Sequence, residues 1–138
     1  RSGRPPADCK AAFKKLASSS CVRVEKANIG SVEDIRRLVK NIDKSMPQLR
    51  GIIHAAGVLD DHMIVDLERE HLELVAGAKI DGTLNLHECT SHLKLDVFAL
   101  FSSVAAMLGT VGQANYCAVN AFMDSFAAQR RANGLAGL

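Results

Sequence analysis

The stretch LDVFALFSS, residues 95–103, followed by Tyr116 and Asn120, decides the fold. It begins as a short run of mostly apolar, strand-forming residues and ends in two hydroxyls, Ser102 and Ser103. Tyr116, the only tyrosine in the chain, begins a helical pattern in which it shares one face with Asn120. Because parallel α/β sheets bind ligands at the carboxyl ends of their strands, we expect the hydroxyls and the phenol to meet there. A phenol in that place is a candidate acid for protonating an alkoxide formed from a carbonyl.

Outward from this stretch, apolar periodicity predicts strands that alternate with helices. Strands are expected over 21–25, 49–55 and 95–102, and helices over 8–18, 31–42, 67–92 and 114–132. Gly77 and Gly82 predict a break or bend in the long third helix, and Gly134 a stop after the last one. This alternation is typical of a parallel sheet with right-handed crossovers.

Composition excludes several classes of function. The 138 residues allow one domain at most, and the net charge of +2 comes from scattered basic residues rather than a nucleic-acid-binding cluster. No apolar run approaches the roughly 20 residues of a membrane helix. The four cysteines lie far apart and the histidines match no metal motif, so we expect reduced thiols, a cytoplasmic protein and no metal.

Three strands are few for a stable sheet of this class. The sequence begins in a turn with no strand before it, and it stops where an α/β fold would continue into another strand. We therefore expect a fragment of a larger domain.

Four motifs occur in order: GIIHAAGVLDD over 51–61, KxxGxxNL over 79–86, FSS over 101–103, and GQANYxxxNAF over 112–122. Together they closely resemble the ketoreductase domains of polyketide synthases and, less closely, of animal-type fatty acid synthases, in the short-chain dehydrogenase/reductase superfamily. The resemblance covers essentially the whole chain. It implies an α/β, Rossmann-like doubly wound parallel sheet that is incomplete at both ends. Residues 1–138 would be a partial ketoreductase domain without the Gly-rich first βα unit, the C-terminal strands and the lid.

The resemblance also implies a catalytic tetrad. Tyr116 would be the acid, and because a free phenol has a pKa of about 10, a cation must lie nearby, a role that falls to Lys79. Ser103 would donate a hydrogen bond to the substrate oxygen, and Asn120 would hold a water in a proton relay. Common short-chain dehydrogenases carry lysine four residues after the tyrosine, where this chain has Asn120. Taken singly, these residues also allow structural roles: packing for Tyr116, a surface charge for Lys79 and a bridge within the helix for Asn120.

Cofactor and substrate residues follow from the same resemblance. Arg1 and Ser2 would meet the 2′-phosphate of NADPH. Asn28 and Ile29 would lie beside the adenine, with asparagine where the family usually has aspartate. The backbone of His54, Ala55, Ala56 and Gly57 would pack on the nicotinamide ribose, near Tyr116 and Lys79; alternatively, it is an ordinary turn. The substrate-orienting residues would be those of a D-hydroxyl fingerprint, or alternatively part of an acidic loop: Leu59, Asp60, Asp61, Leu108 (where the opposite subtype carries tryptophan) and Asn115.

The implied activity is NADPH-dependent reduction of a β-ketoacyl thioester to the β-hydroxyacyl thioester in polyketide or fatty acid biosynthesis. The substrate would be tethered to an acyl carrier protein, and other synthase domains would share the polypeptide. Two alternatives are a non-catalytic reductase-like subdomain of a synthase and a stand-alone short-chain alcohol dehydrogenase. We expect residues 1–138 alone to be inactive and to lack measurable NADPH affinity, without a pyrophosphate cradle.

Overall fold

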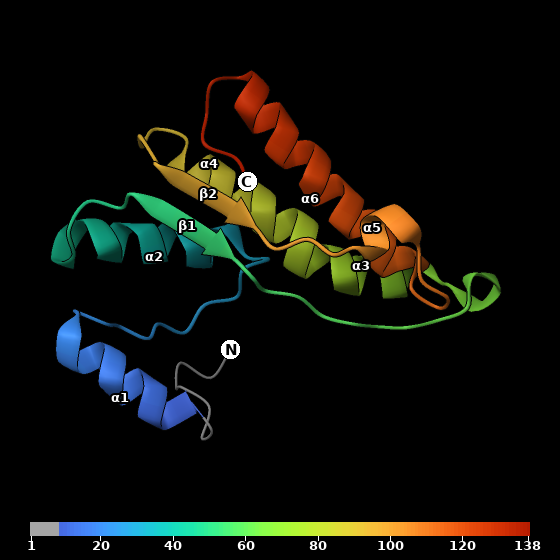
Figure 1. The fold of residues 1–138 in the computed structure, drawn as a ribbon, viewed down its shortest axis with the longest axis horizontal. Coiled ribbons are helices and arrows are strands. Elements are labelled where there is room, and N and C mark those ends of the chain that lie inside the picture. The colour runs from blue at the N-terminus through green and yellow to red at the C-terminus, as the bar shows by residue number, and fades with distance from the viewer. Residues whose placement is uncertain (1–8) are drawn as a thin grey trace.

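The computed structural model describes residues 9–138. Arg1 and Ser2, expected at the cofactor phosphate, lie outside the described residues. Figure 1 shows two parallel strands against a layer of helices. The elements in chain order are α1 (Lys10–Ser19), α2 (Val32–Ser45), β1 (Gly51–His54), η2 (Ile64–Asp66), α3 (Arg69–Ala76), η3 (Gly77–Asp81), α4 (Gly82–Thr90), β2 (Val97–Leu100), α5 (Ala105–Leu108) and α6 (Ala114–Ala132).

The predicted parallel sheet is confirmed, and β1 and β2 are neighbours in it. Their register runs from Gly51 opposite Val97 to His54 opposite Leu100. At the outer edge of β2 the Leu100 amide donates to the Leu138 carbonyl (2.7 Å), and the Leu138 amide donates to the Phe98 carbonyl (2.9 Å). This alternation is the hydrogen-bond pattern of a parallel pair, so the segment after α6 returns to the sheet as expected.

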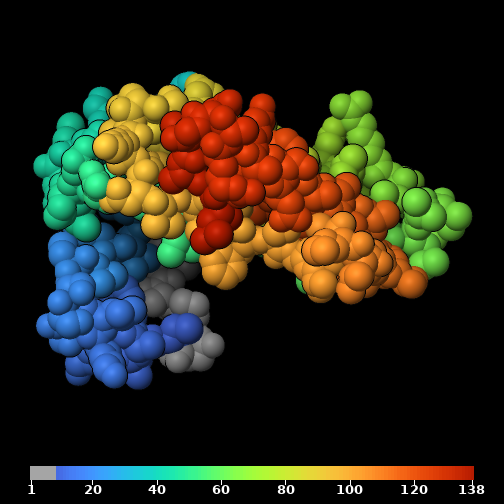
Figure 2. Space-filling model, turned by 45° about the horizontal axis from the view of Figure 1, so that its top comes forward, coloured from blue at the N-terminus to red at the C-terminus, as the bar shows by residue number. Residues whose placement is uncertain are grey.

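One face of the sheet carries the core. Alternate side chains of β1 and β2 are buried, and Phe98 at that face packs with Met123 and Ala127 of α6. On the other face Ile53 is 70% and Val97 43% exposed. Helix α1 buries none of its residues, and Figure 2 shows it as a separate lobe. Among the described residues, no helix combines the length and apolarity needed to cross a membrane.

The strand expected over 21–25 is wrong. Residues 21–28 form no strand, and the side chains of Val22 and Val24 are 37% and 42% exposed. Residues 21–25 would be the third strand of the Rossmann order 3-2-1-4-5-6, and β1 would be the fourth. In that order two other strands lie between them. A third strand therefore cannot pair with β1, and the described part of the chain offers it no other partner.

The helices follow their sequence signals closely. Ser31 caps α2 by accepting a hydrogen bond from the Asp34 amide (3.3 Å). The long helix breaks where Gly77 and Gly82 predicted, as a π-helical turn, η3, between α3 and α4. Gly134 has a φ of +73°, and α6 ends at Ala132, as predicted. The short helix α5 lies where a loop was expected.

Candidate active site

Lys79 is buried beside Tyr116. The π-turn η3 carries the lysine inward, and its side chain is 3% exposed. Its Nζ donates to the carbonyl oxygen of Phe101 (2.9 Å) and lies 5.5 Å from the centre of the Tyr116 ring. Burial lowers the pKa of Lys79, and the Asp124 carboxylate opposes that shift. The surface-charge reading of Lys79 is therefore wrong, and the expected cation lies next to the phenol ring.

Asn120 is fully buried, and only the nitrogen of its side-chain amide has a hydrogen-bond partner among the described residues. Its Nδ2 donates to the Tyr116 carbonyl (2.7 Å), which is the bridge within the helix. Its Oδ1 is buried without a hydrogen-bond partner among the described residues. Because a buried amide oxygen without a partner is costly, this acceptor is suited to a bound water.

The two serines after β2 have different bonding. The Ser102 hydroxyl donates to the Asn120 carbonyl (3.3 Å), so its proton is engaged. The Ser103 hydroxyl accepts from the Ala105 amide (3.2 Å), which leaves its proton available for another acceptor. Of the two hydroxyls, Ser103 is therefore the one able to donate to a substrate oxygen.

A cavity of about 940 Å³ lies between the loop after residue 25, the loop after β1 and the α3–η3 helix. It brings together five of the residues implied for the cofactor: Asn28, Ile29, Ala55, Ala56 and Gly57. The Asn85 side chain donates to the Ile29 carbonyl (3.0 Å) and so holds the loop after residue 25 in place. A Cβ on Gly30 would come within 2.9 Å of the Gly77 carbonyl oxygen, so glycine allows loop and helix this close. A cavity of this size, with small residues around it, is typical of a site for a small organic ligand or cofactor.

The His54 side chain does not line this cavity. It is 1% exposed and points toward Gly82 and the turn of Lys79. Burial, and then the charge of Lys79, lower the pKa of His54. The backbone of His54 thus lies at the end of β1 that faces the cavity, whereas its imidazole is buried beside Gly82 and the turn that carries Lys79.

Two of the residues predicted to orient the substrate, Asp60 and Asp61, are hydrogen-bonded to the segment before Tyr116. Asn115 is buried and its Nδ2 donates to the Asp60 carbonyl (2.7 Å), while Gln113 donates to both carboxylate oxygens of Asp61 (3.1 and 3.0 Å). Gln113 was missed by sequence reasoning, since only the fold places it opposite Asp61. Leu59 and Leu108 are 61% and 80% exposed.

Asp60, His62 and His71 place possible ligand atoms within 4.8 Å of one another. The two imidazoles stack at 3.7 Å, and His62 Nε2 lies 3.3 Å from Asp60 Oδ1. His71 Nδ1 accepts from the Glu68 amide (3.1 Å), so in neutral His71 the proton is on Nε2, where a metal would need a lone pair. We interpret the trio as a hydrogen-bonded pair, Asp60 and His62, with the His71 ring stacked on His62.

The buried imidazole gives a pH prediction. Because the folded-state pKa of His54 is lowered, the unfolded chain takes up the proton first as pH falls through about 6.5. The free energy of unfolding should therefore fall between about pH 7 and pH 5. Burial also lowers the pKa of His87, so His54→Asn should flatten this slope without abolishing it. Urea unfolding at several pH values measures it, and an unchanged slope in His54→Asn would contradict the assignment.

The chain is similar to several known proteins. The family model described as the KR domain matches residues 1–138. A phenolphthiocerol synthesis polyketide synthase of type I from Mycobacterium bovis is 50% identical over 101 residues, which are 73% of this chain and 5% of that protein. A putative inactive phenolphthiocerol synthesis polyketide synthase from Mycobacterium tuberculosis is 45% identical over 117 residues, 85% of this chain and 7% of that protein.

Among solved structures, a ketoreductase domain from the bacillaene assembly line matches with a TM-score of 0.87 and 35% identity. The match covers 95% of this chain and 32% of that one. The chain thus spans about a third of the solved domain and less than a tenth of either synthase.

Proposed function

Because this chain belongs to the KR domain family, the ketoreductases of polyketide synthases in the short-chain dehydrogenase/reductase superfamily, we propose that it reduces a β-ketoacyl thioester with NADPH. The substrate is carried by an acyl carrier protein, and the product is the β-hydroxyacyl thioester. One observation carries the proposal most: the buried Lys79 amine donates to the Phe101 carbonyl, two residues before Ser103, and lies 5.5 Å from the centre of the Tyr116 ring.

In the proposed mechanism two residues of the tetrad act on the substrate oxygen, and the other two act on the tyrosine after it has given up its proton. The bound cofactor supplies a hydride to the carbonyl carbon. Tyr116 gives its phenolic proton to the oxygen as negative charge develops there, and Ser103 donates a hydrogen bond to the same oxygen. Lys79 stabilises the phenolate that is left, and a water held on Asn120 Oδ1 relays a proton from the solvent to that phenolate.

The groups that hold the cofactor are also part of the proposal. Ala55, Ala56 and Gly57 allow the nicotinamide ribose to lie against the backbone after β1, and Asn28 and Ile29 contact the adenosine. Arg1 and Ser2 are assigned to the 2′-phosphate. Residues 1–138 form the central part of a longer reductase domain, whose other segments bind the pyrophosphate, in a cytoplasmic multidomain synthase.

Two alternatives remain in view. One relative is described as putatively inactive, which favours a scaffolding subdomain as the second candidate. Retention of all four tetrad residues, with Lys79 buried beside Tyr116, supports catalysis instead. A stand-alone alcohol dehydrogenase is disfavoured by Asn120 at the position of the usual lysine.

The test is direct reduction. The complete reductase domain containing this chain is incubated with NADPH and a β-ketoacyl thioester, and loss of NADPH absorbance and the β-hydroxy product are measured together. Substrate-dependent formation of equal amounts of NADP⁺ and product is expected. Cofactor binding without turnover would support the scaffolding alternative.

The stereochemical prediction is a D-hydroxyl product. The tied loops that carry Asp61 and Gln113 would bias how the acyl chain enters, while the hydride face stays fixed. A product ratio of about 99:1 requires only about 2.7 kcal/mol between transition states, which a few loop contacts can supply. Chiral chromatography of the product from an unbranched substrate measures it. A predominantly L-hydroxyl product would refute the subtype and leave the reductase proposal standing.

A further inference from the structure

The turn that carries Lys79 is itself unusual. Helices α3 and α4 are joined by five residues of π-helix, Gly77–Asp81, and π-turns are rare and are often found at functional sites. A lysine side chain has four rotatable carbon bonds, so its direction depends on how firmly its backbone is held. Lys79 is nevertheless directed at the Phe101 carbonyl (2.9 Å), with the Met123 sulfur 3.7 Å away.

Two buried polar side chains lie against this turn. Thr83 is fully buried, and its hydroxyl donates to the carbonyl of Lys79 (2.6 Å). The His54 imidazole is 1% exposed and faces the backbone of Ala78 and Lys79, and neither of its nitrogens has a hydrogen-bond partner in the part of the chain that the structure describes. One side chain therefore bonds to the backbone of Lys79 itself, and the other packs beside it.

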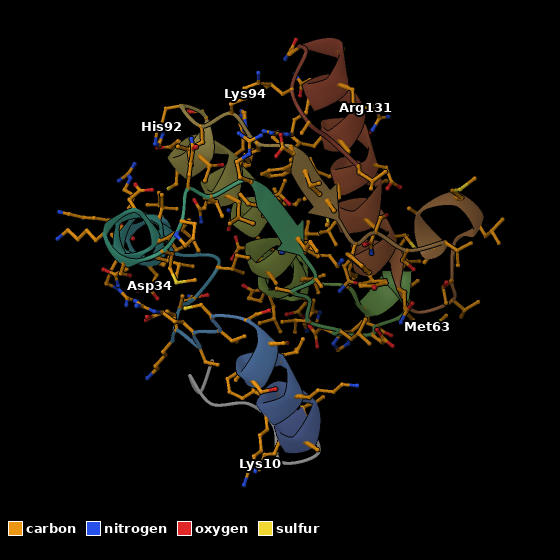
Figure 3. All side chains as sticks on the ribbon, turned by 60° about the vertical axis from the view of Figure 1, so that its left-hand side comes forward. Lys10, Asp34, Met63, His92, Lys94 and Arg131 are labelled. Atoms are coloured by element: carbon orange, nitrogen blue, oxygen red, sulfur yellow. The ribbon has the colours of Figure 1, made fainter. Side chains whose placement is uncertain are left out.

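Gly82 makes room for this arrangement. A Cβ at position 82 would lie 3.3 Å from His54 Nε2 and 3.0 Å from the Ile29 side chain. Without a side chain, the helix can approach the strand end closely enough for the imidazole to reach the π-turn. Figure 3 shows the helical layer and the sheet from a second side.

We propose that Thr83 and His54 are positioning residues for Lys79: they hold the backbone of the π-turn so that the buried amine points at the Phe101 carbonyl and the Tyr116 ring. Neither residue touches the substrate. The consequence for turnover rests on the proposed function, whereas the position of the amine does not.

The chain offers matched controls for both residues. Thr90 is also buried, and its hydroxyl donates over the same 2.6 Å to the carbonyl four residues back, but at the far end of α4. His87 is half-buried against Phe126 and Arg130, away from Lys79. Thr83→Val is therefore compared with Thr90→Val, and His54→Phe with His87→Phe, all in the complete domain.

Two quantities are measured. The first is acetylation of Lys79 by acetic anhydride, followed by mass spectrometry, which reports how well the amine is held and needs no activity. The second is kcat and KM for the thioester. We expect Thr83→Val and His54→Phe to increase Lys79 acetylation several-fold and to lower kcat about ten- to a hundredfold at similar KM, as small misplacements do. Thr83→Ser should restore both quantities, and the control variants should match the wild type in both.

The outcomes separate the two proposals. If Thr83→Val acetylates like Thr90→Val, the positioning role is wrong, whatever the activity. If acetylation rises but kcat does not fall, Lys79 is positioned by Thr83 and the catalytic role of Lys79 is wrong. If His54→Phe fails to fold, His54→Asn replaces it, and Lys79 acetylation equal to that of the wild type would remove His54 from the proposal.

Discussion

Tyr116→Phe in the complete domain is expected to lower kcat about 10²–10⁴-fold, because it removes the proton donor and keeps the ring. The effect should be on the chemical step, so the affinity for NADPH and the melting temperature should stay near those of the wild type. Single-turnover reduction of a β-ketoacyl thioester measures it. Near-normal turnover with hydride transfer rate-limiting would show that another group supplies the proton.

The serines provide the matched control for this experiment. Ser103→Ala removes the hydroxyl whose proton is free, so it should lower kcat, by less than Tyr116→Phe. Ser102→Ala removes the hydroxyl that is engaged with the Asn120 carbonyl, and it should change kcat little. The reverse order would mean that Ser102 is the oxyanion donor.

Lys79→Met is expected to lower kcat about 10²–10³-fold, the usual cost of removing one electrostatic group from an active site. Methionine has a similar length and would lie beside Met123, which Lys79 Nζ approaches within 3.7 Å in the wild type. Because burial lowers the pKa of Lys79, this lysine makes the folded state less stable at any pH below its unfolded-state pKa of about 10.4. Removing the charge should therefore offset part of the stability that is lost with the hydrogen bond to Phe101. Activity should fall far more than the free energy of unfolding.

Turnover and thermal unfolding of the same samples test this second expectation. Lys40→Met, on the exposed face of α2, is the control for loss of a lysine and should leave both quantities unchanged. If Lys79→Met unfolds the domain, Lys79→Arg keeps the charge and should retain the fold with reduced turnover. A fully active Lys79→Met domain would remove Lys79 from the mechanism.

Local sequence signals predicted local structure well. The helix ends and the buried face of α2 follow from nearby residues. Ser31 caps α2, and Ile35 and Val39 on one face of that helix are buried. Gly134 has the positive φ that ends α6. These features depend on residues within a few positions of one another. The strand over 21–25 was wrong because a strand needs a neighbour to pair with, and the described residues offer none at that place in the sheet.

The motifs determined which residue types lie near the carboxyl edge of the sheet, since a lysine, two serines, an asparagine, a tyrosine and a second asparagine in this order fit few other proteins. Only the tertiary structure decided how each is used. It buried Lys79 through a π-turn, engaged Ser102 while leaving the Ser103 proton free, and left Asn120 Oδ1 without a partner among the described residues. The reason is physical: a spacing fixes which side chains can share a helix face or strand end, whereas burial and hydrogen bonding depend on contacts between segments that lie 18 to 56 residues apart.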